Sequence, residues 1–162
     1  MLEIRFAIVA GVLSVIAASS ASALDLHRYW DDRCAECHGH SATFARQQLS
    51  VVDGKLVGKS HRTGLDTFVA NHHTNAELAP QLIAMLAAQA TTVPLYVAKC
   101  AGCHETAAQL ARESLALKGE AVVIKTSARP VADLLKRHGK LTPAEAATMV
   151  ETLKRIVREV GG

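Results

Sequence analysis

Two short stretches decide how this 162-residue chain folds: Cys34-Ala35-Glu36-Cys37-His38 and Cys100-Ala101-Gly102-Cys103-His104. Both read C-A-x-C-H, and together they contain all four cysteines of the sequence. The cysteine pairs of a zinc site usually lie about 12–20 residues apart, and these two pairs are separated by much more of the chain. A thioredoxin-like redox motif would need an alternating pattern of strands and helices, which the sequence lacks. Two plain disulfides would leave the histidine after each pair unexplained.

The spacing C-x-x-C-H is the attachment pattern of c-type haem. In that chemistry two thiols add to the two vinyl groups of one haem, and the adjacent histidine becomes the proximal ligand of the iron. The sequence therefore predicts two covalently bound haem groups. Six residues would hold them: Cys34, Cys37 and His38 in the first motif, and Cys100, Cys103 and His104 in the second.

The offset between the two motifs continues beyond them. Adding 66 to a position between 34 and 72 gives the same residue at eleven positions without gaps. The pairs outside the motifs are Ala42/Ala108, Ala45/Ala111, Arg46/Arg112, Leu49/Leu115, Val57/Val123, Lys59/Lys125 and His72/His138. This pattern indicates an internal duplication, with a first haem-binding domain at 24–90 and a second at 91–162.

The segment 1–23 has the layout of an export signal peptide. A weakly positive start is followed by an apolar stretch at 6–18 and by small residues that end in A-S-A at Ala23, where we expect cleavage. The alternative is an uncleaved membrane anchor, although a bilayer span needs about 20 apolar residues. We expect a periplasmic protein, in a compartment where thiols tend to oxidise.

The composition excludes several other classes of protein. Hydrophobic residues make up 49% of the chain, enough for a folded core. The net charge of +3, without a cluster of five basic residues, gives no case for nucleic-acid binding. Aromatic residues are only 4% of the chain, and we expect bound porphyrin to fill the interior in place of Phe and Trp.

The local patterns predict short elements in each unit. Helices at 26–33 and 94–99 lead into the motifs, and hairpins follow at 51–57, with Asp53-Gly54 at the turn, and at 115–123; irregular loops are the alternative. The last helix begins at Pro143 after a Thr142 cap. Its weaker counterpart at 80–89 has an uncertain start, since residues 74–77 would also cap a helix that Pro80 kinks.

The arrangement resembles di-haem c-type cytochromes, as two small cytochrome c units in tandem. In layout the resemblance covers Tyr29 to Val157, but the specific motifs are the two C-A-x-C-H runs, together with a lead-in at 94–99 similar to the helix before haem attachment. It implies an all-α fold around each haem and electron transfer in the bacterial periplasm between a donor and an acceptor redox protein. Many relatives take a methionine from a loop before the last helix as the sixth iron ligand, and neither loop here has one.

The sixth ligand therefore has to be sought elsewhere. His72 and His138 follow their proximal histidines, His38 and His104, at the same spacing in both units. Each falls on the apolar side of a helix expected at 65–72 or 131–138, where an unpaired imidazole is costly and an iron bond would remove the cost. This favours bis-histidine ligation. The alternatives are Met85 and Met149, His73 as a neighbour of His72, or an open iron; Met149 lies in an apolar stripe typical of core filler.

The preferred function is an electron carrier without catalysis. A di-haem enzyme such as a peroxidase, with Glu77 or Gln81 near the first haem, and a gas-binding haem protein are the alternatives, and both need an open or displaceable ligand. Three histidines without a repeat counterpart are expected to be solvated: His27, His40 and His61. Scattered basic residues would form either a solvated face or a docking site for an acidic partner: Lys55, Lys59, Lys125, Lys136, Arg137 and Lys140.

Overall fold

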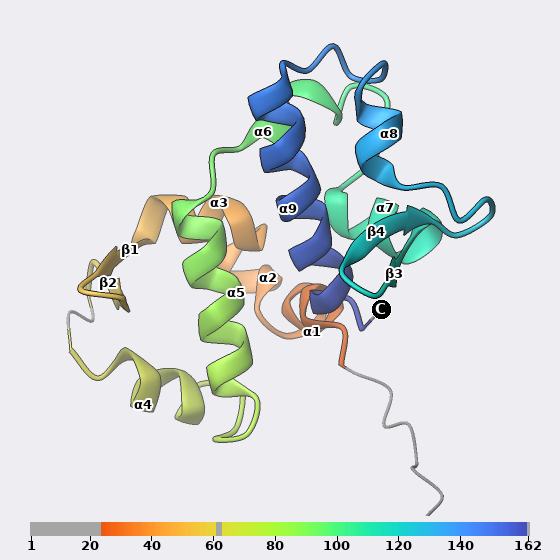
Figure 1. Cartoon of the computed structure of the whole chain (residues 1–162). Coiled ribbons are helices and arrows are strands. Elements are labelled where there is room, and N and C mark those ends of the chain that lie inside the picture. The colour runs from red at the N-terminus through yellow and green to blue at the C-terminus, as the bar shows by residue number, and fades with distance from the viewer. Residues whose placement is uncertain (1–23, 61–62, 162) are drawn as a thin grey trace, which may run out of the picture.

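The computed structural model describes residues 24–60 and 63–161 (Figure 1). The predicted signal peptide at 1–23 and His61 lie outside the described residues. The described chain is mainly helical, with two small antiparallel hairpins. The elements of its first half are α1 (Leu26–Arg33), α2 (Ala35–His38), α3 (Ser41–Gln48), β1 (Leu49–Val52), β2 (Lys55–Gly58), α4 (Leu65–Asn71) and α5 (Ala79–Thr91). Those of its second half are α6 (Leu95–Lys99), α7 (Ala107–Ser114), β3 (Leu115–Lys118), β4 (Ala121–Ile124), α8 (Val131–Leu135) and α9 (Pro143–Glu159).

The offset between the two motifs recurs in the secondary structure. α7 repeats α3, β3 repeats β1 and β4 repeats β2 at that offset, residue for residue. The hairpin registers agree as well, because Leu49 pairs with Gly58 and Leu115 pairs with Ile124. The sequence patterns above do not predict α3 or α7, which are short helices rich in alanine and polar residues.

Both predicted hairpins are confirmed, and each is slightly longer than expected. In the first, Asp53 and Gly54 have φ angles of 50° and 73°, the left-handed pair that a tight two-residue hairpin turn requires. In the second, Gly119 takes a φ of 58°. The alternative of irregular loops is therefore wrong for both segments.

The buried apolar side chains form two clusters, one from each half of the chain. The first gathers around Trp30, Leu82 and Leu86, and the second around Leu153, Ile156 and Val157. At the same place in each cluster lies an alanine with almost no exposed surface, Ala45 in α3 and Ala111 in α7. These alanines let α3 approach α5, and α7 approach α9, with little room for a larger side chain.

The two long helices begin at different kinds of cap. Thr142 accepts a hydrogen bond from the backbone N–H of Glu145, whose carboxylate accepts one from Thr142, so the predicted capping box of α9 is confirmed. α5 begins at Ala79 with Pro80 in its first turn, where proline is tolerated. The preceding turn is closed by Asn75, so a helix that starts at 74–77 and kinks at Pro80 is excluded.

Helix α1 contacts both halves of the molecule. It belongs to the first cluster, yet Figure 1 shows it beside the C-terminal end of α9. The Asp25 carboxylate, which caps α1 through the backbone N–H of Arg28, pairs with Arg112 of α7 at 2.6 Å. Close by, Nε2 of His27 lies 2.9 Å from a carboxylate oxygen of Glu159. His27 is buried, so the expectation that it is solvated is wrong; its partner is 132 residues away and no local pattern signals it.

The pKa of Asp25 reflects this junction. Burial alone raises it, but the hydrogen bonds from Arg112 and from the backbone of Arg28 outweigh burial, and the pKa lies below its ordinary value. A carboxylate whose pKa is depressed by folding stabilises the protein above its unfolded-state pKa, and this contribution is lost as the pH falls through the folded-state pKa.

We predict that Asp25→Asn lowers the free energy of unfolding by about 1 kcal/mol at pH 7, because it removes a half-buried ion pair while asparagine still caps the helix. The difference from the wild type should shrink as the pH falls below about 4, the ordinary range of an aspartate pKa, and disappear once the wild-type carboxylate is protonated. Urea unfolding at several pH values measures both. Asp53→Asn, at an exposed hairpin turn, is the matched control; an effect of Asp25→Asn that is independent of pH would contradict the electrostatic account.

Candidate functional site

The two C-A-x-C-H motifs have nearly the same backbone. Cys34 ends α1 with φ and ψ of −124° and −32°, and Cys100 ends α6 with −123° and −33°. From each cysteine the chain makes one helical turn, closed by a 2.9 Å hydrogen bond from the histidine N–H to the cysteine carbonyl oxygen. The turn carries the second cysteine and the histidine of each motif. The first motif is a helix, α2, and the second is a turn outside any named helix.

The four cysteines are unpaired thiols, so neither motif closes a disulfide in this structure. Cys37 and Cys103 are exposed, and Cys34 and Cys100 are half-buried. Burial raises the pKa of the Cys34 and Cys100 thiols. Dithiol redox motifs instead have a lowered thiol pKa that makes one cysteine a nucleophile, so these pairs do not have the character of a thioredoxin-like site.

Each motif histidine faces the later histidine of its own unit. The ring centroids of His38 and His72 are 6.0 Å apart, and those of His104 and His138 are 5.9 Å apart. Two imidazoles bonded to opposite sides of one metal ion through nitrogen, at about 2 Å each, have ring centroids about 6 Å apart. The structure thus brings each predicted proximal histidine and its predicted distal partner to a spacing that suits one iron between them.

His72 and His138 do not lie on helices, so the expectation that each occupies a helical apolar face is wrong. α4 ends at Asn71, and His72 follows it in an extended conformation with φ −115° and ψ 92°. α8 ends at Leu135, and His138 lies in the turn before Gly139, whose φ is 81°. The short helices still determine where the histidines lie, because the backbone N–H groups of both bond back to α4 and α8.

The structure also shows where the alternative distal ligands lie. Met85 and Met149 are each 1% exposed and belong to the two apolar clusters. Met149 also lines the second cavity, described next, whereas Met85 is absent from the lining of the first. The ring of His73 lies 4.8 Å from that of His72, and its carbonyl oxygen accepts a hydrogen bond from Tyr29. Glu77 and Gln81 are exposed and do not line the first cavity.

A cavity lies at each histidine pair, and the residues that line the two cavities correspond to each other along the internal repeat. Most residues around the first cavity have their counterpart, at the offset between the motifs, around the second. They are the pairs Trp30/Tyr96, Cys34/Cys100, His38/His104, Phe44/Leu110, Leu49/Leu115, Leu65/Val131, Phe68/Leu134, Val69/Leu135, His72/His138 and Thr74/Lys140. Each lining is apolar apart from its cysteines, its histidines and a few polar groups.

The volumes of the two cavities differ. The second measures about 470 Å³, within the roughly 300–1,000 Å³ of cofactor sites. The first measures only about 80 Å³, because the rings of Phe44 and Phe68 lie against the two histidines where the second cavity has leucines. The second cavity therefore fits a porphyrin by volume. The first cavity has the same histidine spacing but must widen before it can hold a porphyrin. The side chain of Phe68, which is 38% exposed, could turn toward solvent to make this room.

Two residues that line the cavities have a buried hydroxyl without a hydrogen-bond partner. Thr74 lines the first cavity, and Tyr96 lines the second and also the junction cavity described below. Burial, together with the nearby Cys100, raises the pKa of Tyr96 to about 12, so its hydroxyl stays protonated and can donate. Buried hydroxyls normally find a partner, and leaving one unpaired costs about 1–3 kcal/mol. A bound group with acceptor oxygens, such as the propionates of a haem, would satisfy both.

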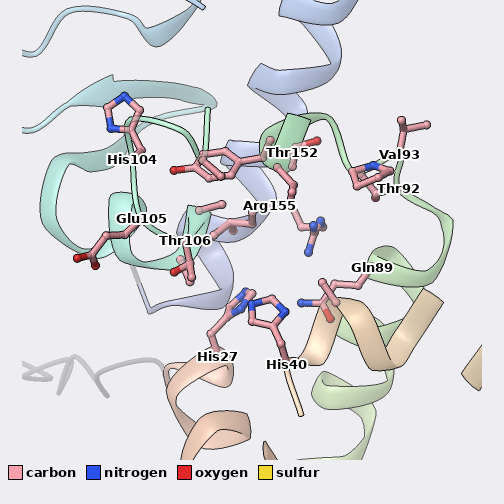
Figure 2. Close-up of a pocket in the computed structure, with 18 of the residues that line it drawn as sticks. His27, His40, Gln89, Thr92, Val93, His104, Glu105, Thr106, Thr152 and Arg155 are labelled. Atoms are coloured by element: carbon pink, nitrogen blue, oxygen red, sulfur yellow. The ribbon is translucent and has the colours of Figure 1, made fainter. Parts of the chain in front are cut away.

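A third cavity, of about 530 Å³, lies at the junction of the two halves (Figure 2). His27, His40 and Gln89 approach it from the first half, and His104, Glu105 and Arg155 line it from the second (Figure 2). Gln89 is buried and donates to Ser41, but its amide oxygen has no partner. His40 is exposed, as expected. No sequence signal points to this cavity, since its walls come from segments far apart in the chain.

The comparisons with known proteins add no identification. The chain matches no family model, no curated protein and no solved structure. Within residues 24–60 and 63–161, no three His, Cys, Asp or Glu side chains are grouped to hold a metal ion by themselves. An ion held by two histidines would need its other ligands from outside the protein. No helix in the same residues is long and apolar enough to cross a membrane.

We predict that Met149→Leu lowers the free energy of unfolding by less than about 1.5 kcal/mol, since it conserves volume in the apolar cluster, whereas Met149→Ala should lower it by about 2–5 kcal/mol. Met85→Leu and Met85→Ala, in the equivalent cluster, should behave alike. Denaturant unfolding measures the losses. A visible absorption spectrum that changes with Met149→Leu would show instead that the sulfur binds the iron.

Proposed function

We propose that this protein is an exported electron carrier with two covalently bound c-type haems, each held between two histidines. One observation carries the proposal: in both halves of the chain, the histidine of a C-x-x-C-H motif faces a second histidine at about 6 Å between ring centroids. A plain disulfide has no use for that second histidine. A zinc site could use two cysteines and two histidines, but within residues 24–60 and 63–161 no three such side chains are grouped to hold a metal ion. The orphaned hydroxyls and the 470 Å³ cavity support the same function.

The residues would divide the work in the same way in both units. Cys34 with Cys37, and Cys100 with Cys103, would form the thioether bonds. His38 and His104 would bind the iron on one side, and His72 and His138 on the other. A haem iron held in this way supplies one-electron transfer between its ferric and ferrous states. Among the proteins that use haem for this purpose, methionine ligation raises the reduction potential, so histidine on both sides predicts potentials below those of His/Met cytochromes.

The surface around the second unit would receive a redox partner. Lys136, Arg137 and Lys140 are exposed on the segment that carries His138, although Lys136 pairs with Asp133 at 2.6 Å. Lys140 lines the second cavity. Lys55, Lys59 and Lys125 are also exposed, but Lys125 donates to the carbonyl oxygen of Arg112. Positive charge close to a haem edge suits an acidic donor or acceptor protein. We place the docking site at 136–140 for this reason.

Two covalent haems can be tested by mass. Expressed in a bacterium that attaches haem to exported cytochromes, the mature protein should have the mass of residues 24–162 plus two haem groups. After proteolysis, the peptides containing 34–38 and 100–104 should each carry one. A purified periplasmic protein with no added mass, or with zinc in place of haem, would overturn the proposal.

The distal ligands can be tested by substitution. His138→Ala should keep both haems but convert one of them from low-spin to high-spin absorption, since only the second iron loses a ligand. His40→Ala, at an exposed histidine without a repeat counterpart, should leave the spectrum unchanged. The red charge-transfer band of a methionine–iron bond in the ferric wild type would contradict bis-histidine ligation.

A further inference from the structure

The two iron sites differ most in the side chains beside their histidines. Two apolar positions of the lining change from phenylalanine to leucine between the first site and the second, Phe44 to Leu110 and Phe68 to Leu134. The other apolar pairs are identical or exchange side chains of the same aromatic or aliphatic kind. These two changes therefore account for most of the chemical difference between the two apolar walls.

In the first site, aromatic rings pack against both histidines. The ring of Phe44 lies edge-on to His38 at 4.7 Å, and Phe68 stacks on His72 at 4.7 Å with 20° between the rings. On its other flank, His72 meets the ring of His73 at 4.8 Å. Ring contacts of this kind stabilise the pair beyond simple burial, so any movement of His72 away from its position breaks several of them.

In the second site, His138 has far less support. Within the described chain, its ring is in contact with one other aromatic ring, that of His104 at 5.9 Å. His72 and His138 are both exposed and both lie outside the preceding helix, so neither feature separates the two sites. What His138 lacks is a stacked ring such as the one that Phe68 gives His72. Turns with few buried contacts open at low free-energy cost. The adjoining cavity is also much larger than that of the first site, at 470 against 80 Å³.

We infer that the second haem site binds a small diatomic ligand in place of His138, while the first site stays closed to such ligands. This inference rests on the proposed function. In the exchange, the bond between the iron and the His138 imidazole breaks, and one bond to the incoming ligand forms. No electron is transferred, and the turn at 136–140 carries the released imidazole toward solvent. The protein thus combines one site built only for electron transfer with one that also binds a ligand.

The test is carbon monoxide added to the reduced holoprotein, followed by absorption spectroscopy. We expect one of the two haems to bind it. His138→Ala should leave this number at one and speed up binding, since it opens the same iron. An increase to two would mean that the wild type binds carbon monoxide at the first haem, and it would overturn the inference. Binding at neither haem, or at both haems equally, in the wild type would do the same.

Exchanging phenylalanine and leucine between the two sites tests whether the ring contacts cause the difference in ligand binding. Leu134→Phe should weaken carbon monoxide binding at the second site by about two- to tenfold, the effect of one added ring contact, and Phe68→Leu should make the first site reactive. If Leu134→Phe does not fold, Phe68→Leu tests the same cause from the first site, because it removes the ring that stacks on the distal histidine there. Affinities unchanged by folded variants would overturn the inference. Mass spectrometry of every preparation distinguishes failure of this inference from failure of the proposed function. Carbon monoxide binding is interpreted only for protein that carries two attached haems, and protein without them contradicts the proposed function instead.

Discussion

One backbone hydrogen bond determines the geometry of each candidate site. The N–H of His38 donates to the carbonyl oxygen of Cys34, and that of His104 donates to Cys100, both at 2.9 Å. Each bond closes a single helical turn, so the histidine and both cysteines of a motif are displayed from one rigid segment. The other elements of each unit complete the site around this turn. The hairpin and the long helix supply apolar side chains to the wall of the cavity, and the short helix places the second histidine across from the first. A set of binding side chains is preorganised when the backbone that carries them is held in one conformation, as this turn is.

The sequence predicted the parts of the fold that depend on local chemistry. Asp53-Gly54 favours a tight hairpin turn, and Thr142 with Pro143 and Glu145 signals a helix start, and both features are where the patterns put them. Predictions were weakest where tertiary contacts override the periodic pattern. His138 continues the apolar spacing of 131–135, yet α8 ends before it because Gly139 and Lys140 turn the chain. The buried pair of His27 with Glu159 joins residues 132 apart, a distance at which no motif operates.

The candidate site was easier to predict than the fold because the duplication gives every residue an internal comparison. Two copies of a motif, each followed at the same spacing by a further histidine, point to the same four side chains that the structure places in facing pairs. The same comparison in space shows how the copies have diverged. Equivalent histidines and cysteines line two cavities of very different volume, because two positions that hold phenylalanine in the first cavity hold leucine in the second. The two halves thus share the facing histidines and the backbone that carries them, while their linings differ.

The contact between α1 and α9 has a consequence for the order of assembly. A chain is made and folds from its N-terminus, and the first apolar cluster is complete once residue 90 has emerged. Glu159, the partner of His27, lies in the last turn of α9. Until α9 is complete, His27 therefore lacks this partner and one face of α1 stays uncovered. On the proposed function, haem attachment at Cys34 and Cys37 would have this interval in which to occur, before the second half packs against α1 and forms the walls of the junction cavity.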